Sequence, residues 1–214
     1  MFGSRRLMMA GVTGLLLVGC ATVEIRETRV VTGRVTDESG QPVAGTPVVI
    51  IGRSLDLVTS RMEYAERNRK EARAVTDAQG QYRLEFVPAS LGNNFYLFFY
   101  DRTGFDRVKY RQPDPLDVTP LLERDRTLTV NQVLRFQPSW SEVQRQIAYY
   151  GAGSDRGKIL RRQGLPEKRE TSGEGDQATD VWWYYADGVG YWFTGDKLTR
   201  TQEFTPIRDA APAK

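Results

Sequence analysis

The sequence predicts an antiparallel β-sandwich followed by a small α+β domain. Short β-branched or alternating segments, separated by turns rich in Gly, Asp and Pro, fill residues 28–136, and this spacing is typical of a sandwich. Apolar residues then recur at helical spacing, and an aromatic-rich run of alternating residues completes residues 139–204. A chain of 214 residues is long enough for two such domains, each with its own hydrophobic core.

The expected strands of the sandwich lie at residues 30–36, 48–51, 81–86, 95–100, 127–130 and 133–134. The alternating segment predicts one buried face, and the continuously apolar segment predicts a central strand. A turn begins at each of Asp37 and Asp77, and the second is expected to close a hairpin. The two carboxylates are candidate calcium ligands, but their position in turns favours capping of nearby backbone N–H groups.

The segment 54–73 is longer than a hairpin connection needs. Its second part is rich in helix formers, and Glu63 with Arg67 and Glu66 with Lys70 stand four residues apart in the supportive orientation. We therefore expect a solvated surface helix or an ordered excursion here. The alternative is a docking element for an anionic partner or a lipid headgroup.

Two helices are expected after residue 138. The first begins near Trp140, with Ser139 or Ser141 as its N-cap, because apolar residues recur from there at helical spacing. The second lies between the N-cap Ser154 and the terminating Gly164. Residues 170–178 are polar and rich in Gly and Glu, so a flexible loop is expected to lead into the aromatic strands.

The aromatic strands are expected to form a meander. With Asp187-Gly188 as a two-residue turn, Trp182 pairs with Phe193 and Tyr184 with Tyr191, while a turn at Gly195-Asp196 pairs Phe193 with Leu198. The face expected to pack on the helices carries Trp182, Tyr184, Tyr191, Phe193 and Leu198. The opposite face carries Val181, Trp183, Tyr185 and Trp192.

Trp183, Tyr185 and Trp192 are the candidate partner-binding residues. Each ring can bury about 150–250 Å², so together they form a larger apolar patch than a monomer usually exposes. Three interpretations are open. In the first, the patch packs against the sandwich or the 170–178 loop. In the second, it binds a protein, since Trp and Tyr are enriched at interface cores. In the third, it stacks on a glycan.

The composition argues against an enzyme. The chain has no histidine and one cysteine, which excludes His-dependent triads, His-ligated zinc and internal disulfides. Residues 152–159 resemble a phosphate-binding loop but lack its Ser/Thr, and Ser154 with Lys158 does not form a Ser-x-x-Lys pattern. No catalytic residue, metal ligand or cofactor is predicted. A carboxylate pair for glycan hydrolysis stays open as an alternative, although no pair stands out.

The N-terminus carries Arg5 and Arg6, then an apolar run to Leu17-Val18-Gly19-Cys20. This string resembles the lipobox of bacterial lipoproteins. The resemblance implies a signal peptide at 1–19, a lipidated Cys20, a tether at 20–27 and, since Ala21 follows the cysteine, a periplasm-facing anchor in the outer membrane of a Gram-negative cell. Removal of the signal peptide lowers the net charge from +3 to +1, so the charge does not indicate nucleic-acid binding.

Two further resemblances assign the domains. Residues 28–136 resemble the carboxypeptidase regulatory-like domain, which is a transthyretin-like sandwich. The resemblance rests on the run 31–37, the segment 40–45 and the turn 76–82. Residues 139–204 are similar to the BamE/SmpA-like fold of outer-membrane lipoproteins. The similarity rests on residues 160–166, on the pattern Trp183-x-Tyr185, and on Tyr191-x-Phe193 with Leu198. Residues 205–214 are expected to form a disordered tail.

These resemblances imply binding or spacing rather than catalysis. The expected function is therefore that of a lipid-anchored, non-catalytic envelope protein that recognises an envelope protein partner through its aromatic surface. The membrane is expected to be a second partner, through the acyl chains. The alternative is a protein that binds cell-wall glycan, or a carboxylate-dependent glycan hydrolase.

Overall fold

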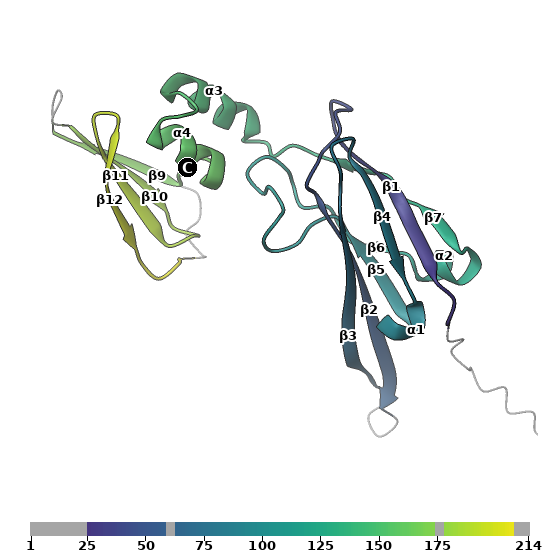
Figure 1. Ribbon diagram of the computed structural model, residues 1–214. Coiled ribbons are helices and arrows are strands. Elements are labelled where there is room, and N and C mark those ends of the chain that lie inside the picture. Colours follow the sequence, from purple (N-terminus) through teal and green to yellow (C-terminus); the bar gives the residue numbers. More distant parts are fainter. Residues whose placement is uncertain (1–24, 59–62, 174–177, 208–214) are drawn as a thin grey trace, which may run out of the picture.

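The computed structural model describes residues 25–58, 63–173 and 178–207 (Figure 1). Within these ranges the chain forms three mostly antiparallel sheets and four helices. Among the described helices, none combines the length and the apolar character that a membrane crossing requires. The expected signal peptide, Cys20 and the lipobox residues Leu17, Val18 and Gly19 lie outside the described residues.

The first sheet is built around β1 (Arg29–Asp37). β4 (Gln81–Phe86) pairs with β1 antiparallel, whereas β7 (Thr127–Thr129) and β8 (Gln132–Leu134) pair with it in parallel. The expectation of an entirely antiparallel sandwich was therefore wrong at these two strands. The reason is the connection through α2 (Thr119–Arg124), which returns the chain to the end of the sheet where β1 begins, so that β7 runs in the same direction as β1. At this end the backbone N–H of Val30 donates to the carbonyl of Arg126.

The second sheet has the order β3-β2-β5-β6. Its strands are β2 (Pro47–Val58), β3 (Glu63–Val75), β5 (Asn94–Phe98) and β6 (Leu116–Asp117). A surface helix or an ordered excursion was expected in this segment, and the helix was wrong, because the described residues from Glu63 onward form β3, which pairs antiparallel with β2 as far as Val75. Ala72 and Ala74 turn toward the core while Arg73 points outward, so sheet pairing with a long neighbour outweighs the helix propensity of the segment.

The two sheets enclose one hydrophobic core, to which β1, β2, β4 and β5 contribute fully buried side chains such as Val35, Ile50, Leu84 and Leu97. The turn after Asp77 joins β3 to β4 across the two sheets, so the hairpin expected there was wrong. A short helix, α1 (Pro88–Leu91), follows β4.

The capping role of the two turn acids is confirmed. The Oδ1 of Asp37 accepts from the backbone N–H groups of Ser39 and Gln41 at 2.9 and 3.1 Å. The Oδ1 of Asp77 does the same for the backbone N–H groups two and four residues further on, at 2.9 and 2.8 Å. Both carboxylates therefore hold the shape of their own turns.

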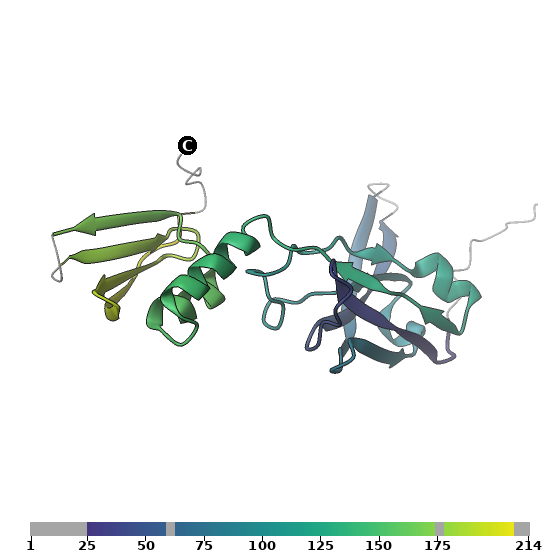
Figure 2. The ribbon, with the colours of Figure 1, turned by 90° about the horizontal axis from the view of Figure 1, so that it is seen from above.

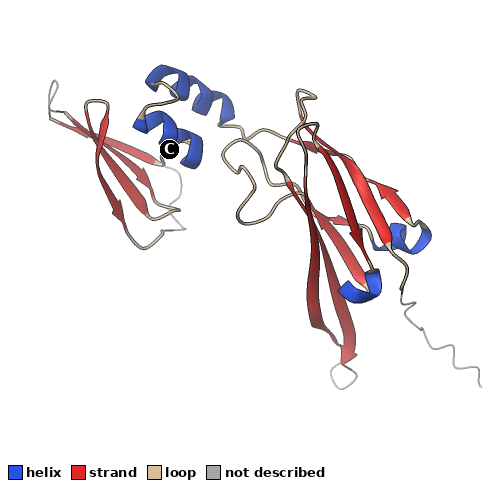
Figure 3. Ribbon diagram, in the orientation of Figure 1, coloured by secondary structure: helices blue, strands red, loops and turns tan. Residues whose placement is uncertain are grey.

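The third sheet has the order β12-β11-β10-β9, and α3 and α4 cover one of its faces (Figures 2 and 3). The elements are α3 (Trp140–Tyr150), α4 (Asp155–Gln163), β9 (Lys168–Ser172), β10 (Thr179–Tyr184), β11 (Val189–Thr194) and β12 (Lys197–Glu203). Both helices lie where they were expected, and the Ser154 hydroxyl caps α4 by accepting from the backbone N–H of Gly157 at 3.0 Å. The loop expected at 170–178 was wrong in its first part, which belongs to β9.

The register of this sheet differs from the expected one by two residues. Trp182 pairs with Tyr191 and Tyr184 with Val189, so the connection spans 185–188 and is not a two-residue turn. Because side chains alternate with a period of two, this shift leaves every residue on its expected face. The pairing of Phe193 with Leu198 is confirmed.

Candidate binding surface

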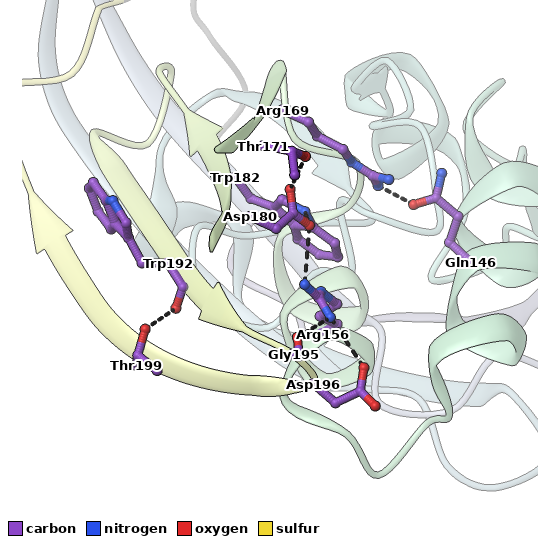
Figure 4. Close-up of polar contacts among 10 residues, drawn as sticks. All are labelled: Gln146, Arg156, Arg169, Thr171, Asp180, Trp182, Trp192, Gly195, Asp196 and Thr199. Carbon is purple, nitrogen blue, oxygen red and sulfur yellow. Dashed lines mark hydrogen bonds and ion pairs between the residues drawn. The ribbon is translucent and has the colours of Figure 1, made fainter. Parts of the chain in front are cut away.

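The helix-facing side of the sheet is fixed by Arg156 on α4 (Figure 4). This arginine is 7% exposed. Its guanidinium pairs with the carboxylate of Asp180 at 3.2 Å and donates to the carbonyl of Gly195 at 2.8 Å. The same carboxylate accepts from the indole N–H of Trp182 at 2.9 Å. This polar cluster therefore joins α4 to the sheet within an otherwise apolar layer.

The opposite face carries the three sequence-predicted residues, and the structure brings them together. Trp183 and Tyr185 stack with parallel rings 6.0 Å apart, and Trp183 meets Trp192 edge to face at 5.1 Å. A fourth ring, Phe204, contacts both Trp183 and Tyr185, with centroids 5.9 and 6.2 Å away. We call Trp183, Tyr185, Trp192 and Phe204 the aromatic cluster. Each member is half-buried, which leaves part of each ring accessible.

Gly190 on β11 explains how closely the rings approach the sheet. A Cβ at this position would lie 2.9 Å from the Cζ3 atoms of both Trp183 and Trp192. The rings therefore cover the bare backbone of Gly190, an arrangement in which aromatic side chains shield a strand glycine.

Charged side chains border the cluster. The indole N–H of Trp183 donates to the carboxylate of Glu170 at 3.0 Å, and the guanidinium of Arg200 lies 4.9 Å above the ring of Trp192. The ammonium of Lys168 pairs with Glu170 at 2.6 Å. The hydrogen bonds from Lys168 and then from Trp183 lower the pKa of Glu170 below its usual value, so this carboxylate stays ionised beside the rings.

The segment after β12 completes the cluster. The backbone N–H of Phe204 donates to the carbonyl of Gly188 at 2.8 Å, and that of Ile207 donates to the carbonyl of Tyr185 at 2.9 Å. Ile207 is thus hydrogen-bonded to the connection between β10 and β11, and the disordered tail expected from residue 205 was wrong up to this residue. Residues 208–214 lie outside the described part of the chain.

Phe204 was missing from the sequence-predicted set. It follows a strand of exposed polar residues, and no periodicity in β12 indicates which face it would join. The signal that was available is the pair of strand aromatics around Gly190, since an uncovered strand glycine attracts aromatic neighbours. Within the described ranges, no group of three or more Asp, Glu or Cys side chains converges as metal ligands.

Comparison with known proteins does not assign the chain to a family. No family model matches the chain, and none of the curated proteins matches it significantly. A solved chlorocatechol 1,2-dioxygenase from Pseudomonas putida is 16% identical over 58% of this chain and 70% of its own, with a TM-score of 0.27. A 9R-lipoxygenase from Cyanothece PCC8801 is 11% identical over 90% of this chain and 44% of its own, with a TM-score of 0.32. Similarities this weak carry no inference about activity.

Proposed function

We propose that this chain is a non-catalytic, lipid-anchored envelope protein that binds a protein partner through the aromatic cluster. The observation that carries the proposal is the combination of half-buried rings at the centre with Lys168, Glu170 and Arg200 around them. Protein interfaces have this composition, with aromatic side chains in the desolvated centre and a polar rim.

The rigidity of the rings supports the same proposal. Trp183 is held by Glu170 on one side and by Trp192 and Tyr185 on others. A side chain that is already fixed loses little rotamer freedom on binding, and each such loss otherwise costs about 0.5–1.5 kcal/mol. The cluster is therefore suited to bind without rearrangement.

The ring geometry favours a protein over a glycan. A sugar stacks on the free face of an aromatic ring, but Trp183 and Trp192 meet edge to face and Trp183 stacks parallel to Tyr185. These contacts occupy ring faces that a flat glycan platform would leave open. Protein side chains, by contrast, can pack against ring edges as well as faces.

The fold families and the location belong to the same proposal. The capped turns at Asp37 and Asp77 support a transthyretin-like, carboxypeptidase regulatory-like first domain. Two helices followed by antiparallel aromatic strands support a BamE/SmpA-like second domain. Lipidation at Cys20 would hold both at the periplasmic side of the outer membrane and raise their effective concentration near membrane partners.

Site-specific photocrosslinking in cells tests the proposal. A photoreactive phenylalanine analogue is placed at Tyr185 or at Trp192, and at Tyr149 as a matched control, because Tyr149 is 82% exposed but lies on α3 away from the cluster. We expect one protein to be trapped from the two cluster positions and not from Tyr149.

The trapped protein is then purified and its binding measured by calorimetry. Trp192→Ala should weaken binding by at least about tenfold, as loss of a central aromatic does at interfaces, whereas Tyr149→Ala should not. Equal trapping from all three positions, or equal affinities for both variants, would overturn the proposal. Trapped glycan without protein would favour the alternative.

A further inference from the structure

The outer face of the second sheet holds a pocket that the sequence did not indicate. Its floor is formed by Val49 and Ile51 of β2, by Phe98 at the end of β5 and by Tyr100 just after that strand. The two aliphatic residues are only 3% and 5% exposed although they point away from the sandwich core. The cavity has a volume of about 540 Å³, which lies within the roughly 300–1,000 Å³ typical of small-molecule sites.

The walls of this pocket are basic. Arg69 and Arg73 come from β3, and Arg102 and Arg107 come from the connection between β5 and β6 (Figure 1). Two carboxylates also line it, those of Glu71 and Asp101. Four arginines and two acids give the pocket a net charge of +2.

The two acids are both committed to the same arginine. The guanidinium of Arg73 lies 2.9 Å from the carboxylate of Glu71 and 3.2 Å from that of Asp101. Among the residues whose side chains the structure describes, none forms an ion pair or hydrogen bond with the guanidinium groups of the other three arginines. Three positive groups from two separate segments therefore face one apolar floor without an acidic partner there.

Asp101 also fixes the loop that carries two of these arginines. Its Oδ1 accepts from the backbone N–H groups of Thr103 and Gly104 at 2.9 and 2.6 Å. These bonds, first that from Gly104, lower the pKa of the Asp101 carboxyl below its usual value. An ionised Asp101 holds the turn and Arg73 together, so Arg102 is presented on a fixed loop and not on a free one.

We propose that this pocket binds a soluble phosphomonoester whose aromatic or aliphatic part lies on Phe98 and Tyr100. A phosphomonoester carries a charge of about −1.5 to −2 at pH 7, which matches the net charge of the pocket. Guanidinium groups bind phosphate oxygens in pairs of parallel hydrogen bonds. The apolar floor would bury the organic part of the ligand and so distinguish an ester from inorganic phosphate.

A soluble ligand fits better than a lipid headgroup. Ile25, the first described residue, contacts Ala89 of α1, beside the end of β4. The loop that carries Arg102 and Arg107 leaves the opposite end of β5, since α1 precedes this strand and the loop follows it (Figure 1). With the lipid anchor of the proposed function, on which this step rests, the side of the pocket formed by this loop would face away from the bilayer.

Calorimetry with phenyl phosphate tests the inference on the full mature chain. We expect saturable binding of phenyl phosphate, weaker binding of inorganic phosphate and no binding of benzyl alcohol, because only the first ligand combines the charge with the ring. Arg102→Gln with Arg107→Gln should weaken phenyl phosphate binding by at least about tenfold. Both side chains are exposed, so the variant should fold normally.

Arg124→Gln with Arg161→Gln is the matched control, since it removes the same charge at exposed positions outside the pocket. This variant should bind phenyl phosphate like the wild type. Equal weakening by both double variants, or binding only to vesicles that contain phosphatidic acid, would overturn the inference. The inference is independent of the aromatic cluster, so the Arg102/Arg107 variant should still bind the protein partner.

Discussion

The guanidinium of Arg156 on α4 and the carboxylate of Asp180 on β10 form an ion pair at 3.2 Å beneath the aromatic sheet. The same guanidinium carbon lies 4.5 Å from the ring centroid of Phe193 and 5.7 Å from that of Trp182. One side chain therefore pairs with an acid whose side chain is 21% exposed, and it contacts two rings of the apolar layer between α4 and the sheet. This arrangement fixes the sheet whose other face carries the aromatic cluster.

Arg156→Met should destabilise this part of the chain by about 2–4 kcal/mol, because Asp180 would be left largely buried without its cationic partner and the cation–π contacts would be lost. All four tryptophans lie between residues 140 and 192, so urea unfolding followed by tryptophan fluorescence reports on this region alone. Asp196→Asn is the control: Asp196 also contacts Arg156 but is 94% exposed, and its loss should cost less than about 1 kcal/mol. Equal losses of unfolding free energy in the two variants would contradict the role assigned to the pair of Arg156 and Asp180.

Gly190→Ala should displace the rings above it. A methyl group there would meet Trp183 and Trp192 at 2.9 Å, and overpacking of this kind costs about 1–3 kcal/mol. We expect the near-UV circular dichroism of the tryptophan pair to decrease while the far-UV spectrum is retained. Gly153→Ala, where a Cβ meets nothing within 4 Å, should leave both spectra unchanged. A Gly190→Ala spectrum identical to that of the wild type would show that the rings do not rest on this glycine.

Phe204→Ala should expose Trp183 and Tyr185 to water, because Phe204 is the ring that contacts both of them from the end of β12. The tryptophan emission should shift to longer wavelength and quenching by acrylamide should increase. Glu203→Ala, which changes an exposed neighbour on the same strand, should produce neither effect. Unchanged quenching in the Phe204 variant would mean that this ring does not shield the cluster.

Tyr82 makes the sandwich sensitive to alkaline pH. Its hydroxyl donates to the carbonyl of Val130 at 2.8 Å, and burial raises its pKa well above the usual 10.0. A raised pKa in the folded state stabilises the protein fully below pH 10, and this contribution is lost as pH rises toward the folded-state pKa. The difference in unfolding free energy between wild type and Tyr82→Phe, followed by circular dichroism, should therefore shrink above about pH 10. A difference in unfolding free energy that stays the same at all pH values would contradict this role of Tyr82.

The sequence was most informative where local chemistry decides the structure. The helix between Ser154 and Gly164 was predicted because a hydroxyl cap and a terminating glycine each bond to backbone groups only three or four residues away. The two faces of the aromatic meander were predicted too, although its register was not. A shift by two residues preserves the alternation, so burial patterns alone do not distinguish the two registers.

Non-local contacts account for what was missed. Residues 63–73 are rich in helix formers but belong to β3, because β2 offers a row of pairing groups along the strand. The parallel pairing of β7 with β1 depends on where α2 returns the chain. The arginine pocket joins β3 to a loop about thirty residues further on, and only the folded sheet brings Arg69 and Arg102 to one site.

The most direct test of the account is the dissociation constant of the crosslinked partner protein for the purified chain, compared with that for the Trp183→Ala/Trp192→Ala variant. If the aromatic cluster is the binding surface, the double variant should bind at least about a hundredfold more weakly while keeping its far-UV circular dichroism. Tyr149→Ala should keep the wild-type value. An unchanged dissociation constant in a folded double variant would contradict the central claim.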